Sequence, residues 1–439
     1  MRKEHSYLYR AVKFKIFPDA GQRKTLQSIS DNLWSVWNDA LVERVTLFEM
    51  HHKPLYEAIK TAREENDEAR LSELRAKLKQ AFREHRITHF DQCKSLTPRR
   101  KASASFAAVP CAWQQETLKI LDGAFRSYLS LKKKGDLFAR PPREQRAEEF
   151  FEIQGLLSFA VIVGDHTVAA QKEVASSMSR LLHEGRQAEI VLSPGKSLPG
   201  GAELRFKLAS YAGKKLGEAV RVKKFTLYRD PPDMRQSGNF WISIAYEVEK
   251  PEAISFDPNC AVYIALGASS LGVVSPSGEE VLKLWRPDKY WEPKRDTLKK
   301  RIAMCTKGSR AWKRRHNAKR CIEQKSARQR KDSDRKIVIE KLVAHGVHFV
   351  ISDIVIRGKK GRLADASKEG RGGALGLNWS AQNTGIARLV QHLEQKAEEH
   401  GGSVRRFRAT SKLSPDIGQG YQNKIAMAKR LKEDFLASQ

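Results

Sequence analysis

The sequence predicts an α+β protein of several domains: an N-terminal β-barrel with an inserted helical lobe, followed by a mixed α/β domain. Stretches of helical periodicity and stretches of short apolar strands follow one another in blocks, which is typical of α+β organisation. The chain has 439 residues, of which 40% are hydrophobic. That is enough for two or three domains with cores of their own.

The chain opens with a strand and then a helix. Tyr7–Phe17 alternates in hydrophobicity and ends at Pro18, after which Asp19 is placed to cap a helix with an apolar stripe. Trp34 and Trp37 on this stripe are expected to pack in a core. We therefore assign 1–18 to the first strand of the barrel.

Residues 19–140 are predicted to form the helical lobe. The segment 57–86 is charged, with Ala and Leu at helical spacing, and indicates a solvated helical hairpin. Thr97–Ser105 is interpreted as a basic loop, and Pro110–Leu131 as an amphipathic helix.

Residues 141–254 are predicted to complete the barrel. Five candidate strands are separated by Gly and Pro turns: Phe159–Val163, Glu189–Leu192, Ala202–Leu208, Val220–Tyr228 and Phe240–Val248. Short strands at regular spacing expose edges, and closing them into a barrel removes those edges.

The stretch 259–284 contains two apolar strands, Ala261–Leu266 and Gly272–Ser275, and a Ser-Gly hairpin signal before Val281–Leu284. A hairpin of this kind opens the RNase H-like (RuvC) nuclease fold, whose first strand carries an aspartate that holds a catalytic metal. Ala265 stands at that position here, and a methyl group binds no magnesium. Residues 255–439 are therefore predicted to form an RNase H-like domain with a degenerate active site.

A long basic segment interrupts this domain at 290–340. Lys294–Lys336 holds many Lys and Arg residues and few acids, and its helical pattern breaks at Lys307-Gly308-Ser309. It therefore predicts a hairpin of two long basic helices. Like charges at this density repel one another, and phosphates relieve the repulsion with release of counterions. The formal net charge of +30 also indicates a polyanionic partner, with nucleic acid ahead of an anionic membrane.

The compartment is predicted to be the cytoplasm. The five cysteines contain no CxxC pair, which argues against a disulfide framework or a cysteine zinc site. We identify no apolar signal core at the N-terminus and no membrane-spanning run.

Four segments, in order, resemble TnpB, the transposon-encoded RNA-guided nuclease family related to the miniature type V CRISPR effectors. YRAVKFKIFPDAGQRKTL is similar to the family's opening strand and helix, and CAWQQETLKILDGAFRSYLSLKKKG to its later recognition helix. The basic segment starting YWEPKRDTLKKRI resembles the helical pair inside its RuvC domain. NTGIARLVQHLEQKAEEHGGSV resembles the helix before its zinc ribbon. The resemblance implies a prokaryotic, nucleoid-associated protein.

The departures from the family pattern lie in its catalytic and zinc positions. The family resembles other RuvC enzymes in holding two metal ions with three acids. These positions fall on Ala265, on Ser352 or Asp353, and on Tyr421; counting from the two sides leaves Ser352 and Asp353 both open. The first zinc pair falls on Ser414 and Ile417, and the second is missing, so the C-terminus is truncated. The resemblance thus implies a nuclease derivative without catalytic metal, zinc or cofactor other than a guide RNA.

The partners that the resemblance implies are a guide RNA and a double-stranded target DNA with a short adjacent motif, with one protein for each guide RNA. Tyr56 and Gln115 fall among the groups that read this motif. The basic residues expected to line the nucleic-acid channel are Arg301, Lys313, Arg314, Arg315, Lys319, Arg320 and Arg328.

The function that follows is RNA-guided DNA binding without cleavage, through an R-loop, as in the nuclease-dead TnpB-like repressors called TldR. Such a protein represses transcription by blocking RNA polymerase. One alternative is a residual nuclease with a metal site rebuilt from Asp353 and Asp416. Another is an RNA-binding scaffold or recruiter without a DNA target.

Overall fold

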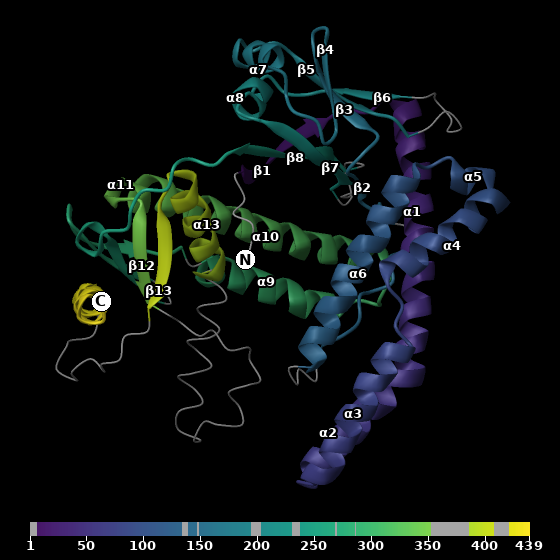
Figure 1. Ribbon diagram of the computed structural model, residues 1–439, viewed down its shortest axis with the longest axis horizontal. Helices are drawn as coiled ribbons and strands as arrows, with labels where there is room; N and C mark the ends of the chain where they lie inside the picture. The colour runs from purple at the N-terminus through teal and green to yellow at the C-terminus, as the bar shows by residue number, and fades with distance from the viewer. Residues whose placement is uncertain are drawn as a thin grey trace. The chain divides into compact units, whose positions relative to one another are not determined.

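The computed structural model describes residues 7–133, 139–146, 149–194, 203–230, 238–267, 270–285, 287–352, 386–407 and 421–439 (Figure 1). The chain divides into two compact units, Met1–Glu249 and Lys250–Gln439. Both units mix helices and strands, so the α+β prediction is confirmed. None of the helices in these ranges is long and apolar enough to cross a membrane.

Unit 1 contains two four-stranded sheets, with strand orders β1-β8-β7-β2 and β4-β3-β5-β6. β1 pairs with β8 in antiparallel register over its full length, from Tyr7 opposite Glu249 to Ile16 opposite Phe240. The strands are β1 (Tyr7–Ile16), β2 (Ile153–Gly155), β3 (Phe159–Val163), β4 (His166–Ala169), β5 (Ala188–Leu192), β6 (Leu204–Lys207), β7 (Arg221–Arg229) and β8 (Phe240–Glu249).

The prediction of a closed barrel is wrong for the described strands, because both sheets are open. Three of the four outer strands, β2, β4 and β6, have only three or four residues each, which keeps those edges short, whereas the fourth, β1, has ten. Buried side chains of both sheets, such as Phe14, Phe225 and Ile190, belong to one hydrophobic core. Two short helices, α7 (Ser176–His183) and α8 (Ala212–Leu216), lie in the region interpreted as strands.

The helical lobe lies between β1 and β2 in sequence. Asp19 caps α1 with a capping box, since its side chain accepts from the Gln22 N–H and the Gln22 side chain accepts from the Asp19 N–H. The helices are α1 (Ala20–Leu47), the π-helical turn η1 (Phe48–His52), α2 (Lys53–Glu64), α3 (Glu68–Glu84), α4 (His89–Ala102), α5 (Ala104–Ala107) and α6 (Cys111–Lys133).

Thr97–Ser105 is mainly helical and not a loop, because α4 runs through it to Ala102. Arg100 fixes this end of α4: its guanidinium donates to the carbonyls of Val109 and Ala107 and to Gln114 Oε1. These acceptors lie outside α4, so the helix propensities of residues 97–105 alone do not predict that this segment is helical.

A buried ion pair ties α1 to α6. Arg44 Nη1 lies 2.8 Å from Asp122 Oδ1, and the two side chains are 4% and 8% exposed. The Arg44 Nε donates to Gln92 Oε1 of α4 at 2.8 Å, so three helices meet at one guanidinium.

Unit 2 is built on one five-stranded sheet of order β11-β10-β9-β12-β13. β9 is central; it pairs antiparallel with β10 and parallel with β12. Ala261, Tyr263 and Ala265 pack against α14, and Val262 and Ile264 pack on the opposite face with α13 and η3. The strands are β9 (Val262–Ala265), β10 (Ser270–Ser275), β11 (Gly278–Lys283), β12 (His348–Ser352) and β13 (Ser403–Phe407).

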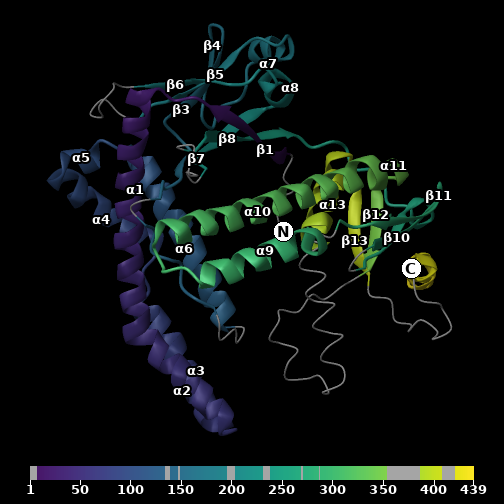
Figure 2. The ribbon, with the colours of Figure 1, turned by 180° about the vertical axis from the view of Figure 1, so that it is seen from behind.

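The basic segment forms two long helices, as the sequence predicts, and they lie side by side (Figure 2). Gly308 separates them with φ 87°. Trp291 Nε1 donates to Gln329 Oε1 at 2.8 Å and holds one helix to the other. The helices of unit 2 are η2 (Pro258–Cys260), α9 (Pro287–Ala303), α10 (Arg310–Lys336), η3 (Ile337–Leu342), α11 (Val343–His345), α13 (Ile386–Glu399) and α14 (Tyr421–Ala437).

Replacing Arg44 alone with Met is expected to lower the free energy of unfolding by about 1–3 kcal/mol, because the buried Asp122 then keeps only its 2.7 Å ion pair with Arg126 among the described residues, and Gln92 Oε1 loses its donor. The double variant Arg44→Met, Asp122→Leu is expected to recover most of this loss. Urea denaturation of the four proteins of this cycle measures the coupling. A double variant that is less stable than Arg44→Met contradicts the prediction.

Asp334, at the end of α10, is 3% exposed, and burial raises its pKa from 3.8 to about 6. The folded state therefore binds this proton more tightly than the unfolded chain does. The contribution of Asp334 to stability is complete below about pH 4 and declines as pH rises through about 6. Asp334→Asn is thus expected to raise the melting temperature at neutral pH and to change it little near pH 4. The exposed Asp332→Asn on the same helix serves as control, and a destabilised Asp334→Asn at neutral pH would show the argument to be wrong.

Candidate nucleic-acid interface

The α9–α10 pair carries a large excess of positive charge. In α10, twelve of 27 residues are Lys or Arg, and three are Asp or Glu. An isolated helix with this composition is opposed by repulsion between neighbouring turns. Bound phosphates offset such repulsion.

The structure places all seven predicted channel residues on this pair: Arg301 on α9, and Lys313, Arg314, Arg315, Lys319, Arg320 and Arg328 on α10. Two of them are engaged within the protein. Arg315 donates to the Arg301 carbonyl at 2.8 Å, and Lys319 lies 3.3 Å from Glu323 Oε1. Arg315 therefore joins the two helices, which is a structural task that the sequence does not reveal.

The other five, Arg301, Lys313, Arg314, Arg320 and Arg328, are exposed. Within the described ranges, no carboxylate forms an ion pair with any of them. Their positive charge is left available to a partner that brings its own anions.

Aromatic side chains accompany these cations. Trp312 stacks on His316, with ring centroids 4.8 Å apart, and the Lys294 ammonium lies 4.8 Å from the ring centroid of the exposed Tyr290. Rings beside cations can stack unpaired bases while the cations hold phosphates. Basic residues dominate the composition of this segment, so the sequence alone does not point to these rings.

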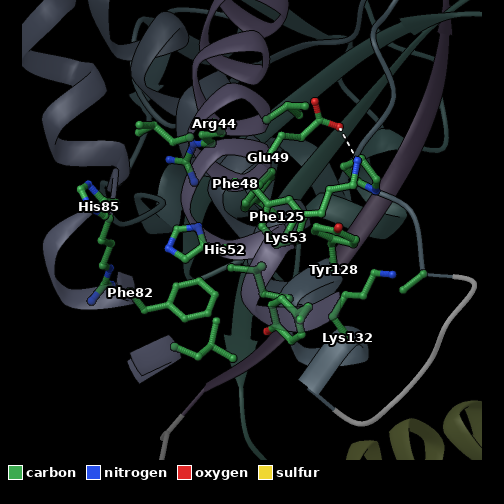
Figure 3. Close-up of a pocket in the computed structure, with 18 of the residues that line it drawn as sticks. Arg44, Phe48, Glu49, His52, Lys53, Phe82, His85, Phe125, Tyr128 and Lys132 are labelled. Carbon is green, nitrogen blue, oxygen red and sulfur yellow. Dashed lines mark ion pairs between the residues drawn. The ribbon is translucent and has the colours of Figure 1, made fainter. Parts of the chain in front are cut away.

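The helical lobe contains a cavity of about 1560 Å³ between α1, η1, α2, α3 and α6 (Figure 3). Ten of its lining residues are Lys or Arg and four are Asp or Glu. Phe48, Phe82, Phe125 and Tyr128 supply aromatic surface. An aromatic wall with a cationic rim suits an unstacked base and its phosphate.

His52 is part of the aromatic wall. Its ring stacks on the ring of Phe82, as Figure 3 shows, and the two centroids lie 4.1 Å apart. Burial lowers the pKa of His52 and so favours the uncharged imidazole, while a backbone hydrogen bond with Ala81 acts in the opposite direction.

Of the two residues expected to read a DNA motif, Tyr56 lines this cavity and Gln115 does not. The Tyr56 ring lies 6.0 Å from Phe48, and burial raises the pKa of its phenol, so the hydroxyl keeps its proton and can donate. Gln115 lies exposed on α6.

The predicted acid positions meet at the carboxyl ends of two neighbouring strands. β12 runs parallel to β9 with Ile351 beside Ile264, so the same register carries Ser352 beside Ala265. Ala265 is 1% exposed, and the Ser352 hydroxyl accepts from the Leu266 N–H at 2.9 Å. The described side chains at this edge therefore provide no carboxylate for the magnesium pair of a RuvC nuclease, and they do not fit one.

The structure gives no side-chain geometry for the remaining predicted acid and zinc positions. Asp353, Ser414, Asp416 and Ile417 lie outside the described residues. Tyr421 begins α14, and only its backbone is described. Among the described residues, no group of three or more His, Cys, Asp or Glu side chains could hold a metal ion.

No protein-family model and no curated protein matches the chain. Two solved structures are similar to it over most of its length. The structure described as "Cryo-EM structure of the Cas12f1-sgRNA-target DNA complex" has a TM-score of 0.48 and 10% identity, covering 98% of this chain and 99% of that one. The structure described as "Cryo-EM structure of CRISPR-Cas12f Ternary Complex" has a TM-score of 0.30 and 12% identity, covering 94% and 76%. Both TM-scores are below 0.5, so neither likeness establishes a shared fold.

Proposed function

We propose that this protein binds a guide RNA and, through it, a double-stranded DNA target that it does not cut. The unpaired cations of α9 and α10 carry the proposal. Five exposed Lys and Arg side chains without described ion-pair partners form a surface for phosphates, which position a nucleic acid without reading its sequence.

The guide RNA then reads the target sequence, because it pairs with the target strand and the protein does not need base-specific contacts for this. The cavity beside Tyr56 is the candidate place for contact with a short motif next to the target. The TnpB resemblance of the sequence supports this division of tasks.

Binding without cleavage is supported by Ala265. Two-metal nucleases use carboxylates to hold the ions that activate water and stabilise the leaving oxygen. Ala265 is buried where the first carboxylate is expected, and the Ser352 hydroxyl beside it is used by the backbone of Leu266. A protein that opens DNA at one site and leaves it intact obstructs RNA polymerase, so the biological role we propose is transcriptional repression in the cytoplasm of a prokaryote.

The central test is to purify the tagged protein from the cells that encode it and to sequence the RNA and DNA that accompany it. We expect one discrete RNA whose end matches an enriched promoter. A complex rebuilt with that RNA is expected to protect matched DNA, and to leave it uncut with Mg²⁺ or Mn²⁺. Cleavage would favour the residual nuclease, and a discrete RNA without matching DNA would favour the RNA-binding scaffold.

The α10 surface can be tested by replacing Lys313, Arg314, Arg320 and Arg328 together with Ala. If each contacts one phosphate, the slope of log affinity for RNA against log salt should fall by roughly 3–4, at about 0.7–0.9 for each contact. The matched control removes four cations that already pair with carboxylates: Lys77, Arg180, Arg205 and Lys429. An equal fall in both variants would mean that only net charge matters.

A further inference from the structure

Lys424, in the first turn of α14, lies directly over the end of β9. A Cβ atom added at Gly267 would lie 2.8 Å from Lys424 Nζ, and one added at Gly272 would lie 2.0 Å from the Lys424 carbonyl oxygen. Both separations are shorter than van der Waals contact. At Gly272 the neighbour is the backbone of α14, so only glycine permits this approach, whereas at Gly267 the neighbour is the flexible end of the Lys424 side chain. The ammonium lies beside Gly267, two residues beyond Ala265, at the edge where Ser352 ends β12.

This position is unfavourable for a cation in the free protein. Burial lowers the pKa of Lys424, because the charged form loses hydration. A cation near the N-terminus of a helix also opposes the helix dipole, and the first turn of α14 contains no acid.

Partners that could offset this cost are few. Within the described ranges, the ammonium's partner is the Met427 thioether, at 3.6 Å, and no carboxylate pairs with it. The neighbouring Asn423 Oδ1 is buried and has no described hydrogen-bond partner. The described side chains therefore give this edge a positive charge, since Ala265 and Ser352 carry none.

We propose that Lys424 binds a backbone phosphate of the target nucleic acid at the carboxyl ends of β9 and β12. The inference rests on the proposed nucleic-acid-binding function and extends it to this edge. Where a RuvC nuclease neutralises the phosphate with metal ions held by acids, an ammonium supplies positive charge without needing carboxylate ligands. It does not generate a metal-bound nucleophile, so the contact holds the strand and leaves its phosphodiester intact.

The test compares wild type, Lys424→Met and Lys424→Arg as complexes with the guide RNA. Met keeps an unbranched stem over Gly267 and removes the charge, whereas Arg keeps the charge. We expect Lys424→Met to lose about tenfold in affinity for matched DNA, with a salt slope lower by about 0.9. Guide RNA binding should be unchanged, and Lys424→Arg should retain most of the affinity.

Thermal unfolding separates this role from a structural one. Removing a poorly solvated charge is expected to leave the melting temperature of Lys424→Met equal or higher, so DNA affinity falls without loss of stability. Lys429→Met on the same helix removes a cation paired with Glu279 and is the matched control. Unchanged DNA affinity and salt slope in Lys424→Met, or an equal loss in the Lys429 control, overturns the phosphate contact.

Failure of the guided function gives a different pattern. If wild type complexed with its RNA does not bind matched DNA, the guided function fails, and the same variants are compared on single-stranded DNA without a guide. A lower salt slope for Lys424→Met than for wild type and Lys429→Met then supports the phosphate contact, and equal slopes overturn it.

Discussion

Positive charge without an internal counter-charge is the constraint on which the nucleic-acid-binding surface depends. α10 contains four times as many Lys and Arg residues as Asp and Glu residues, so the helix does not neutralise itself. The fold holds it in place through uncharged or backbone acceptors, such as Gln329 for Trp291 and the Arg301 carbonyl for Arg315. Cation–carboxylate pairs would have consumed the charge, whereas these contacts leave most of it to a polyanionic partner.

A positive charge without a described carboxylate partner also lies at the carboxyl end of β9. The buried Ala265 favours the fold but provides no ligand for a metal, and Lys424 is a poorly solvated cation whose cost is offset by no described carboxylate. Within the described part of the chain, Ala265 and Ser352 bring no carboxylate to this edge, and Lys424 brings a cation. A cation there suits the phosphate contact that we propose, whereas the two-metal chemistry that hydrolyses a phosphodiester needs carboxylate ligands.

The helical lobe combines rigidity with an accessible cationic cavity. The Arg44–Asp122 pair and Gln92 join α1, α4 and α6 at the wall of the cavity, which Arg44 and Asp122 help to line. The π-helical turn η1 carries Phe48 and His52 into its wall; such turns are frequent at functional sites. A wall of uncharged rings in a fixed frame loses little conformational freedom when a base stacks on it.

The sequence by itself determined the α+β class, the positions of the longer strands, the basic helical pair with its break at Gly308, and Ala265 in place of an acid at the end of β9. Each follows from local periodicity, turn chemistry or the identity of one side chain. Only the tertiary structure decided that the N-terminal sheets stay open, that Arg100 holds 97–102 in α4, and that Lys424 lies over Gly267. Those outcomes depend on contacts between residues far apart in the chain, and no local pattern records them.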